Sequence, residues 1–225
     1  MKKYSYLILI FSIIITGCKK KQLKTPTDVS FQMDINRSPS NSGHLVFNSG
    51  SILLANFNVE GERQEGGPIS FNKSFSQGLS INLNSTSIPD LVFDIPQGNY
   101  YSLSVSFLTF DDNGDITIQV DGTYTNQLGS SFPLRLEFLS GEYFSVVGED
   151  ESGEATIVLK KDVSATSLIK FDPIYWFGLI SYGMFDNATL VNIGGQQTIL
   201  INESVNSNIY DLVVDRIDHT TESLW

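Results

Sequence analysis

The chain has 225 residues, and its 14 Lys and Arg against 25 Asp and Glu give a net charge of −11. Hydrophobic residues make up 41% and charged residues 17% of the chain, which is enough apolar material for a folded core. The acidic balance argues against nucleic-acid binding, which requires a basic surface. A single Cys excludes an internal disulfide and a zinc site built from several Cys residues, and two His residues far apart in the sequence argue against a His-rich metal site.

The first 17 residues have the pattern of a secretory signal peptide. Lys2 and Lys3 precede the apolar run Leu7–Ile15, which a single Ser interrupts. A membrane-spanning helix needs about 20 apolar residues, so this run is too short to be one. Residues 1–17 alone do not distinguish an ordinary cleaved signal peptide from a lipoprotein signal peptide.

The segment Ile15–Cys18 resembles a bacterial lipobox, in which small residues precede an obligatory Cys. The resemblance implies that Cys18 is diacylated, that residues 1–17 are removed and that the new amino group is acylated as well. Cys18 is the only Cys of the chain. Two or three acyl chains hold a protein stably at a bilayer. We therefore expect a lipid-anchored protein that contacts the lipid bilayer through acylated Cys18.

A basic tether, residues 18–27, follows the signal peptide. Four Lys residues within positions 19–24 would lie beside anionic headgroups. In the lipoproteins that the lipobox resembles, an Asp directly after the Cys signals retention in the inner membrane, so Lys19 favours the outer membrane and leaves its periplasmic and external faces open. From Thr25 onward the chain has 8 basic and 25 acidic residues, a net charge of −17. Fully extended, the segment after Cys18 would span about 30 Å.

Most of the chain from residue 28 alternates apolar and polar residues, which is typical of strands with one buried face. Predicted strands recur roughly every 8 to 12 residues, with turn-forming residues between them, and no strand–helix–strand alternation occurs before residue 160. This spacing predicts an antiparallel β-sandwich or barrel. The predicted strands are 29–35, 52–59, 69–73, 79–83, 91–95, 101–110, 116–120, 134–138, 143–147 and 155–159.

The last third of the chain is predicted to contain two short helices with a strand, 198–202, between them. Asp172 and Pro173 are typical of a helix start, and the apolar positions 174–185 predict a buried helix. A second helix is expected over 209–217, where apolar residues lie on one face. The expected fold is therefore mainly β. It is an antiparallel β-sandwich domain over residues 28–225, with two short C-terminal helices and a sub-boundary near residue 160.

The segment Asp94–Tyr100, with the sequence Asp-Ile-Pro-Gln-Gly-Asn-Tyr, resembles a turn that enters a strand in certain β-sandwiches. These are the fimbrillin-like and transthyretin-like domains of Bacteroidota envelope lipoproteins. The resemblance covers residues 28–160 and implies a β-sandwich lipoprotein of the cell envelope. It brings no motif for a named activity.

One loop is a candidate calcium site. Asp111, Asn113 and Asp115 alternate as ligands do in a calcium-binding loop, and Gly114 allows a sharp turn. The Glu that would complete an EF-hand is absent, because Gly122 stands in its place. The alternative is a hairpin turn made of turn-forming residues. No cofactor other than this calcium ion is expected.

Tyr175, Trp176 and Phe177 form an aromatic cluster and are the candidate ligand-binding residues. On the surface they would stack on a sugar ring or fill a pocket of a protein partner. Inside a buried helix they would be core residues instead.

The sequence contains no complete catalytic motif. Gly178–Gly183 differs from Gly-x-Ser-x-Gly by one residue, and neither His44 nor His219 lies beside an evident nucleophile in the sequence. A catalytic pair of carboxylates, of the kind that hydrolyses glycosides, stays an alternative, since Asp and Glu are abundant.

We therefore predict a non-catalytic lipoprotein, anchored in the outer membrane, that acts in binding or assembly at the cell envelope. Its partner would be an envelope protein or a glycan, and not a nucleic acid. The alternatives are a carbohydrate-binding accessory lipoprotein and a carboxylate-dependent hydrolase.

Overall fold

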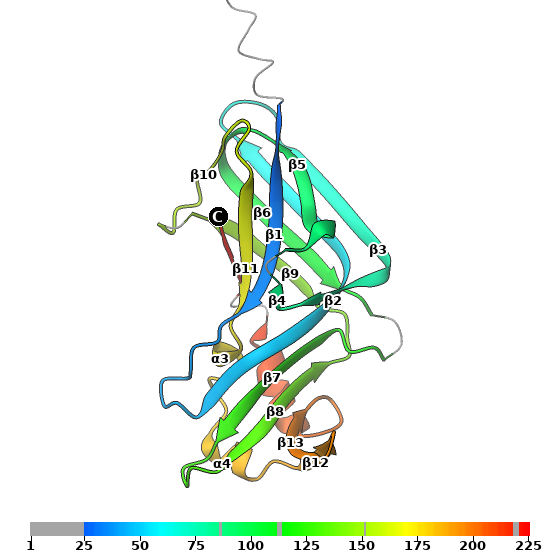
Figure 1. The fold of residues 1–225 in the computed structure, drawn as a ribbon, viewed down its shortest axis with the longest axis vertical. Helices are drawn as coiled ribbons and strands as arrows, with labels where there is room; N and C mark the ends of the chain where they lie inside the picture. The colour runs from blue at the N-terminus through cyan, green and yellow to red at the C-terminus, as the bar shows by residue number, and fades with distance from the viewer. Residues whose placement is uncertain (1–24, 86, 112–113, 151, 218–220) are drawn as a thin grey trace, which may run out of the picture.

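The computed structural model of the chain describes residues 25–225 except 86, 112–113, 151 and 218–220. The protein is elongated and mainly β, as expected (Figure 1). The predicted signal peptide and Cys18 lie outside the described residues. Within the described part of the chain, no helix is long and apolar enough to cross a bilayer.

The strands are numbered as in Figure 1. They are β1 (Pro26–Ile35), β2 (Leu45–Arg63), β3 (Ile69–Asn82), β4 (Asn84–Ser85), β5 (Val92–Pro96), β6 (Gly98–Thr109), β7 (Ile118–Thr125), β8 (Ser131–Phe138), β9 (Tyr143–Glu149), β10 (Ile157–Leu159), β11 (Ala165–Phe171), β12 (Leu190–Ile193), β13 (Gln196–Ile201) and β14 (Thr221–Leu224). The helices are α3 (Pro173–Trp176), α4 (Tyr182–Asp186) and α5 (Ser207–Val214), with a 3-10 turn at Pro89–Leu91.

The strands pair in a mixed sheet. The order is β12-β13-β8-β7-β2-β6-β9-β14-β11-β1-β4, with β3 beside β2, β5 beside β1 and β10 beside β6. Most pairs are antiparallel, as expected, but β1–β11, β8–β13 and β9–β14 are parallel. Parallel partners need a long connection between them, and β11, β13 and β14 come from the last third of the chain. Strands from both sides of residue 160 therefore share the same hydrogen-bonded sheet.

At the end where the chain enters β1, two groups of strands pack through aromatic side chains. Figure 1 shows β1, β5 and β11 in front of β6 and β9. Phe31 on β1 contacts Phe57 on β2, with ring centroids 5.1 Å apart. Phe171 on β11 contacts Phe107 on β6 and Phe144 on β9, at 6.1 and 5.5 Å. All five rings are buried, so this end of the molecule has a core made largely of aromatic residues.

At the opposite end, the three helices cover one face of β2, β7 and β8. Each helical segment places one aromatic ring on one of these strands. The ring pairs are Phe47–Phe177, Tyr124–Phe185 and Phe138–Tyr210, with centroids 5.2, 4.6 and 5.2 Å apart. The helices therefore bury the apolar face of this part of the sheet.

The single helix predicted over 174–185 is wrong, because the segment forms two short helices. Asp172 caps α3 as predicted, since its Oδ1 accepts hydrogen bonds from two backbone N–H groups of the first turn, at 3.1 and 3.3 Å. The helix ends at Trp176, and Ser181 then caps α4. Gly178 lies in the break, where it weakens the helix, and Ser181 offers the chain a new start. The predicted C-terminal helix is confirmed as α5.

A bulge replaces the turn expected within residues 69–83, which form one strand, β3, over most of their length. The register between β3 and β2 shifts at this point. Leu54 pairs with Leu79, whereas Asn56 pairs with Ser74. The residues between Ser74 and Leu79 thus face a single residue of β2, so the strand bends without reversing.

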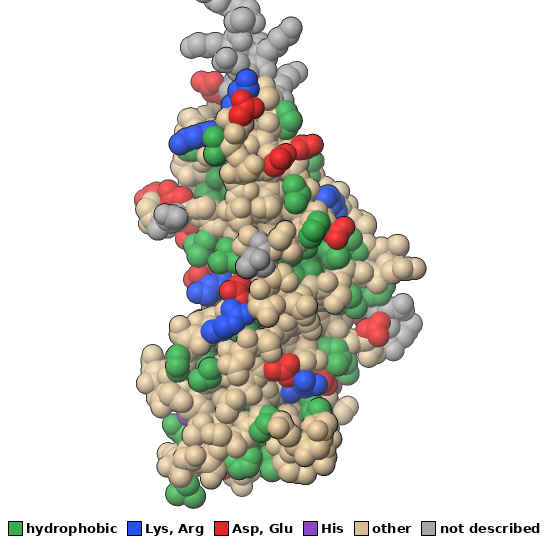
Figure 2. All heavy atoms as spheres, viewed as in Figure 1, with side chains coloured by type: hydrophobic (Ala, Val, Ile, Leu, Met, Phe, Trp, Pro, Cys, Tyr) green, Lys and Arg blue, Asp and Glu red, His purple; other side chains and the backbone are tan. Residues whose placement is uncertain are grey.

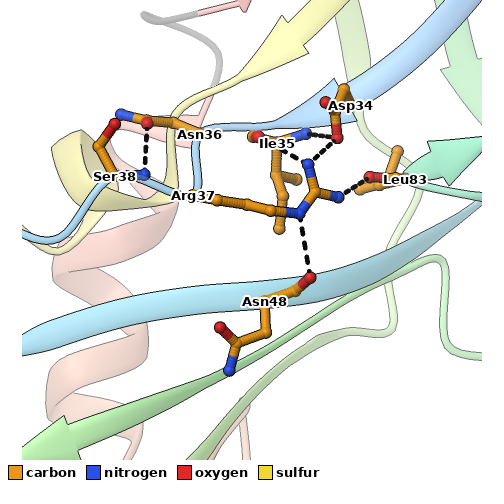
Figure 3. Close-up of polar contacts among 7 residues, drawn as sticks. All are labelled: Asp34, Ile35, Asn36, Arg37, Ser38, Asn48 and Leu83. Atoms are coloured by element: carbon orange, nitrogen blue, oxygen red, sulfur yellow. Dashed lines mark hydrogen bonds and ion pairs between the residues drawn. The ribbon is translucent and has the colours of Figure 1, made fainter.

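Arg37, in the connection from β1 to β2, joins three segments of the chain (Figure 3). Its Nε donates to the backbone oxygen of Asn48 at 3.1 Å, and its Nη2 donates to that of Leu83 at 2.8 Å. Its Nη1 bonds the carboxylate of Asp34. The planar guanidinium therefore ties the end of β1 to β2 and to the segment after β3.

Candidate functional site

The end of the molecule opposite the start of β1 carries a shallow groove, and we call this end the far pole. It consists of the β7–β8 turn (126–130), the β12–β13 hairpin and α4, at the lower end of Figure 1. The groove has a volume of about 250 Å³. Its lining comes from separate stretches of the chain and includes Tyr124, Leu128, Phe132, Phe185, Asp186 and Leu190.

The β7–β8 turn holds Leu128 out in solvent. Oδ1 of Asn126 accepts hydrogen bonds from the backbone N–H groups of Leu128, at 3.0 Å, and Ser130, at 2.8 Å. The backbone N–H of Asn126 donates to the oxygen of Ser130 at 2.9 Å. Leu128 is nevertheless 91% exposed. The hydrogen-bonded turn therefore presents an aliphatic side chain to solvent at the groove.

A hydrogen bond between Tyr124 and Asp186 joins β7 to α4 at the groove. The Tyr124 hydroxyl donates to Oδ1 of Asp186 at 2.6 Å, and Phe185 stacks on the tyrosine ring. Burial raises the pKa of Tyr124, and the bond to Asp186 raises this pKa further. The phenol therefore stays protonated at neutral pH and keeps the Asp186 carboxylate in place at the groove.

The far pole is nearly free of charged side chains. Positions 122–134 and 187–202 contain no Asp, Glu, Lys or Arg, although the chain from Thr25 onward has a net charge of −17. Figure 2 shows the same contrast, with red and blue side chains over the upper and middle parts of the molecule and tan and green at the lower end. A partner can therefore approach the far pole without the repulsion that the rest of the surface exerts on an anion.

The candidate calcium loop is only partly described. Asp111 and Asp115 are exposed, and Asn113 lies outside the described residues. In the part of the chain that is described, no three His, Cys, Asp or Glu side chains gather closely enough to hold a metal ion. Calcium binding by Asp111, Asn113 and Asp115 stays a prediction.

The three aromatic candidates do not share an exposed face. Trp176 and Phe177 are buried, and Phe177 packs on Phe47 of β2. Tyr175 is 41% exposed, with the guanidinium of Arg216 3.8 Å from the centre of its ring. Trp176 and Phe177 have the positions of core residues, so a ligand on this surface would meet Tyr175 alone.

The residues considered for catalysis make local structural contacts. Nδ1 of His44 hydrogen-bonds the hydroxyl of Ser40 at 3.0 Å and that of Ser42, and the imidazole packs on Tyr182. Burial lowers the pKa of His44 and thereby favours the neutral ring. The Ser181 hydroxyl accepts the backbone N–H of Met184 as a helix cap. His219 lies outside the described residues.

Sequence reasoning missed the groove because its residues come from three stretches that the fold brings together. A usable signal was nevertheless present. The two uncharged stretches, 122–134 and 187–202, are long for a chain with this acidic balance. Both end up at the far pole.

No protein-family model, no curated protein and no solved structure matches the chain.

Proposed function

We propose that the chain is a non-catalytic lipoprotein of the bacterial outer membrane, anchored through acylated Cys18, and that its far pole binds a partner at the cell envelope. The observation that carries the proposal is the placement of the groove. Residue Thr25 continues the tether at one end of the molecule, and the groove, in a region with few charged side chains, lies at the other end. A protein anchored at one end would present the opposite end to its surroundings.

The charge distribution supports the same arrangement. The basic tether would lie on anionic headgroups, whereas the body, with a net charge of −17, would be repelled from them. Together with the reach of the tether, this repulsion would hold the far pole away from the membrane that carries the anchor.

We also propose that the end near β1 is a β-sandwich of the kind that the Asp94–Tyr100 turn resembles. Tyr100 supports this, because its hydroxyl donates to the backbone oxygen of Pro96 at 2.6 Å. A tyrosine bonded to the backbone a few residues upstream, at the start of a strand, is a corner found in immunoglobulin-type sandwiches. The aromatic contacts of Phe31 and Phe171 across the two groups of strands support it further.

Membrane fractionation tests the anchor. Wild-type protein should be found in the membrane fraction and should need detergent for its release, whereas Cys18→Ala should be released without detergent. A Cys18→Ala protein that stays in the membrane fraction would contradict the lipid anchor.

Thiol labelling tests the role of the far pole. Leu128→Cys and Val163→Cys replace exposed aliphatic residues at opposite ends, since the Val163 backbone oxygen accepts a bond from Thr27 at the start of β1. If the far pole is occupied in cells, a maleimide should label Leu128→Cys several-fold more slowly than Val163→Cys in the native envelope. The two rates should become similar in purified, diluted protein. Equal rates in both settings would contradict the proposal, and labelling of intact cells by an impermeant maleimide would identify the external face.

A second candidate function is carbohydrate binding, which the composition of the groove favours. Phe132 offers an aromatic side chain, and Asn126 and Asp186 offer polar groups beside it. Sugar sites combine an apolar surface with such hydrogen-bonding groups. In affinity electrophoresis, a polysaccharide ligand should retard the wild type more than Asp186→Asn, a variant that can still accept the Tyr124 bond. Equal mobility of the two proteins in every polysaccharide gel would remove this candidate.

A further inference from the structure

We propose that the occupant of the far pole is a second copy of this chain, and that the two copies join by antiparallel pairing of their β12 strands. This inference builds on the proposed function, because it names the partner of the same pole. It is carried by the open edge of β12, by the lack of charged residues at positions 187–202 and by the self-complementarity of an edge strand.

β12 is the last strand of the sheet. Within the described residues, β13 is its only strand neighbour, so its other edge is open (Figure 1). Gly194 and Gly195, with φ of 60° and 89°, form the two-residue turn that joins β12 to β13. In such a hairpin the pair next to the turn, Ile193 and Gln196, is a hydrogen-bonded pair.

The hydrogen-bonding direction alternates along β12. Val191 and Ile193 face β13 with their backbone N–H and C=O groups, so those of Leu190 and Asn192 point away from the sheet. These groups are arranged to bond another strand. An unpaired edge of this kind is a template for strand addition.

The long edge strand β3 shows how the same molecule protects an edge. β3 contains the bulge between Ser74 and Leu79, and it carries Lys73. The Lys73 Nζ donates to the backbone oxygens of Asp90 and Val92, at 2.8 and 2.9 Å. Bulges and lysines are among the features that prevent edge-to-edge association. β12 has no bulge in its pairing with β13, and positions 187–202 have no charge and no Pro.

Charge favours a second copy at this position. Two bodies of net charge −17 repel each other over most of their surfaces, and the far pole is where that repulsion is weakest. An edge strand is also complementary to its own two-fold copy, as an isologous interface requires. The groove adds apolar surface next to the edge, since Leu190 belongs to both and exposed Leu128 also lines the groove.

One pairing register uses the outward-pointing backbone groups of both Leu190 and Asn192. With the two-fold axis at Val191, Leu190 of each copy bonds Asn192 of the other, and the two Val191 residues face each other as a non-hydrogen-bonded pair. Such pairs have Cα atoms about 4.5 Å apart, which lies within the range that a disulfide can bridge. Val191→Cys should therefore cross-link two copies.

Disulfide cross-linking of the detergent-solubilised full chain tests this geometry. After mild oxidation, Val191→Cys should migrate as a dimer on a non-reducing gel and as a monomer after reduction. The matched control is Val158→Cys, because Val158 is an exposed Val on another edge strand, β10, and it should stay monomeric. Adding Leu190→Lys to Val191→Cys should reduce the dimer about tenfold, since a lysine on the edge opposes pairing. The wild-type chain, whose only Cys is Cys18, measures any dimer that forms through Cys18 itself.

Light scattering of the detergent-solubilised full chain gives a test that needs no new Cys. The wild type should have the mass of two protein chains, and Leu190→Lys should have the mass of one with an unchanged melting temperature. A monomeric wild type, or a folded Val191→Cys protein that cross-links no more than Val158→Cys, would overturn the inference. The lipid anchor is tested separately, by the loss of membrane retention in Cys18→Ala. The dimer can therefore be disproved while the proposal of a lipid-anchored protein still stands.

Discussion

Single residues hold the turns of this protein, and Tyr100 is the clearest case. It is buried in β6, its hydroxyl bonds the oxygen of Pro96 at 2.6 Å, and the guanidinium of Arg63 lies 5.8 Å from the centre of its ring. Burial raises the pKa of Tyr100 to about 12, although the positive charge of Arg63 acts against this. The side chain thus joins the end of β5 to the start of β6.

Replacing Tyr100 by Phe should lower the free energy of unfolding by about 1 kcal/mol at pH 7, because the bond to Pro96 is lost. The folded-state pKa lies above the unfolded value of about 10, so the protonated phenol stabilises the fold fully below pH 10. That contribution is lost as the pH rises through about 12. Urea unfolding at pH 7 and pH 11 should show a smaller difference between wild type and Tyr100→Phe at pH 11. Tyr143→Phe, at an exposed position, is the control and should match the wild type at pH 7.

His44 should make stability depend on pH on the acidic side. Burial lowers the pKa of His44 from 6.5, so the folded state prefers the neutral ring. The stabilisation is complete above pH 6.5 and is lost as the pH falls through the lower folded-state value. We expect the free energy of unfolding to fall less steeply between pH 7 and pH 5 in His44→Gln than in the wild type. An NMR titration that placed the His44 pKa above 6.5 would contradict this expectation.

At the scale of elements, the bulge in β3 determines how the long strands fit together. Gly78 in the bulge has φ of 72°, a conformation that other residues adopt only with strain. A Cβ at this position would lie 2.7 Å from Leu53 Cδ1 and 3.2 Å from the ring of Phe110. Both the backbone and the neighbouring side chains therefore require glycine here.

Gly78→Ala should destabilise the protein more than Gly43→Ala. Gly43 has nearly the same φ, 71°, but nothing lies within 4 Å of its Cβ position, so its replacement adds backbone strain alone, about 1–2 kcal/mol. Gly78→Ala adds a steric clash, which should bring at least about 1 kcal/mol more. Chemical denaturation of the two variants measures both values. Equal losses would show that Leu53 and Phe110 move aside without cost.

At the scale of the whole molecule, the acidic body carries a large uncompensated charge. From Thr25 onward the net charge is −17, so ion pairs such as those of Arg37 with Asp34 and of Arg135 with Asp121 leave most of the acidic side chains without a basic counterpart. Like charges at this density repel one another and destabilise the compact state.

The free energy of unfolding should therefore rise when NaCl is increased from about 10 mM to about 150 mM, because the screening length falls from about 30 Å to about 8 Å. Urea titrations at the two salt concentrations measure the effect. The gain should shrink at pH 5, where carboxylates begin to take up protons. Stability that does not change with salt at pH 7 would mean that the carboxylates lie too far apart to interact.

Local sequence signals predicted much of the fold. Alternation identified β1, Asp172 and Pro173 marked the start of α3, and the apolar face over 209–217 identified α5. Turn residues were less reliable, because Ser76, Gln77 and Gly78 serve a bulge as well as they serve a turn.

β11 and β14 were missed for a specific reason. Ser167 on β11 and Ser223 on β14 are both buried, where apolar residues would mark a strand. Their hydroxyls hydrogen-bond each other at 2.9 Å. A buried serine is stable only when such a partner is present, and this partner lies far along the chain, so hydrophobic periodicity alone cannot find it.

The sequence by itself determined the β class, the acidic body and the lipobox-like segment at Cys18, because each depends on composition or on neighbouring residues. The tertiary structure decided the parallel pairing of β1 with β11, the burial of Trp176 and Phe177, and the open edge of β12. It also brought Leu128, Asp186 and Leu190 to one groove. These features depend on contacts between residues far apart in the chain, and such contacts exist only after the chain has folded.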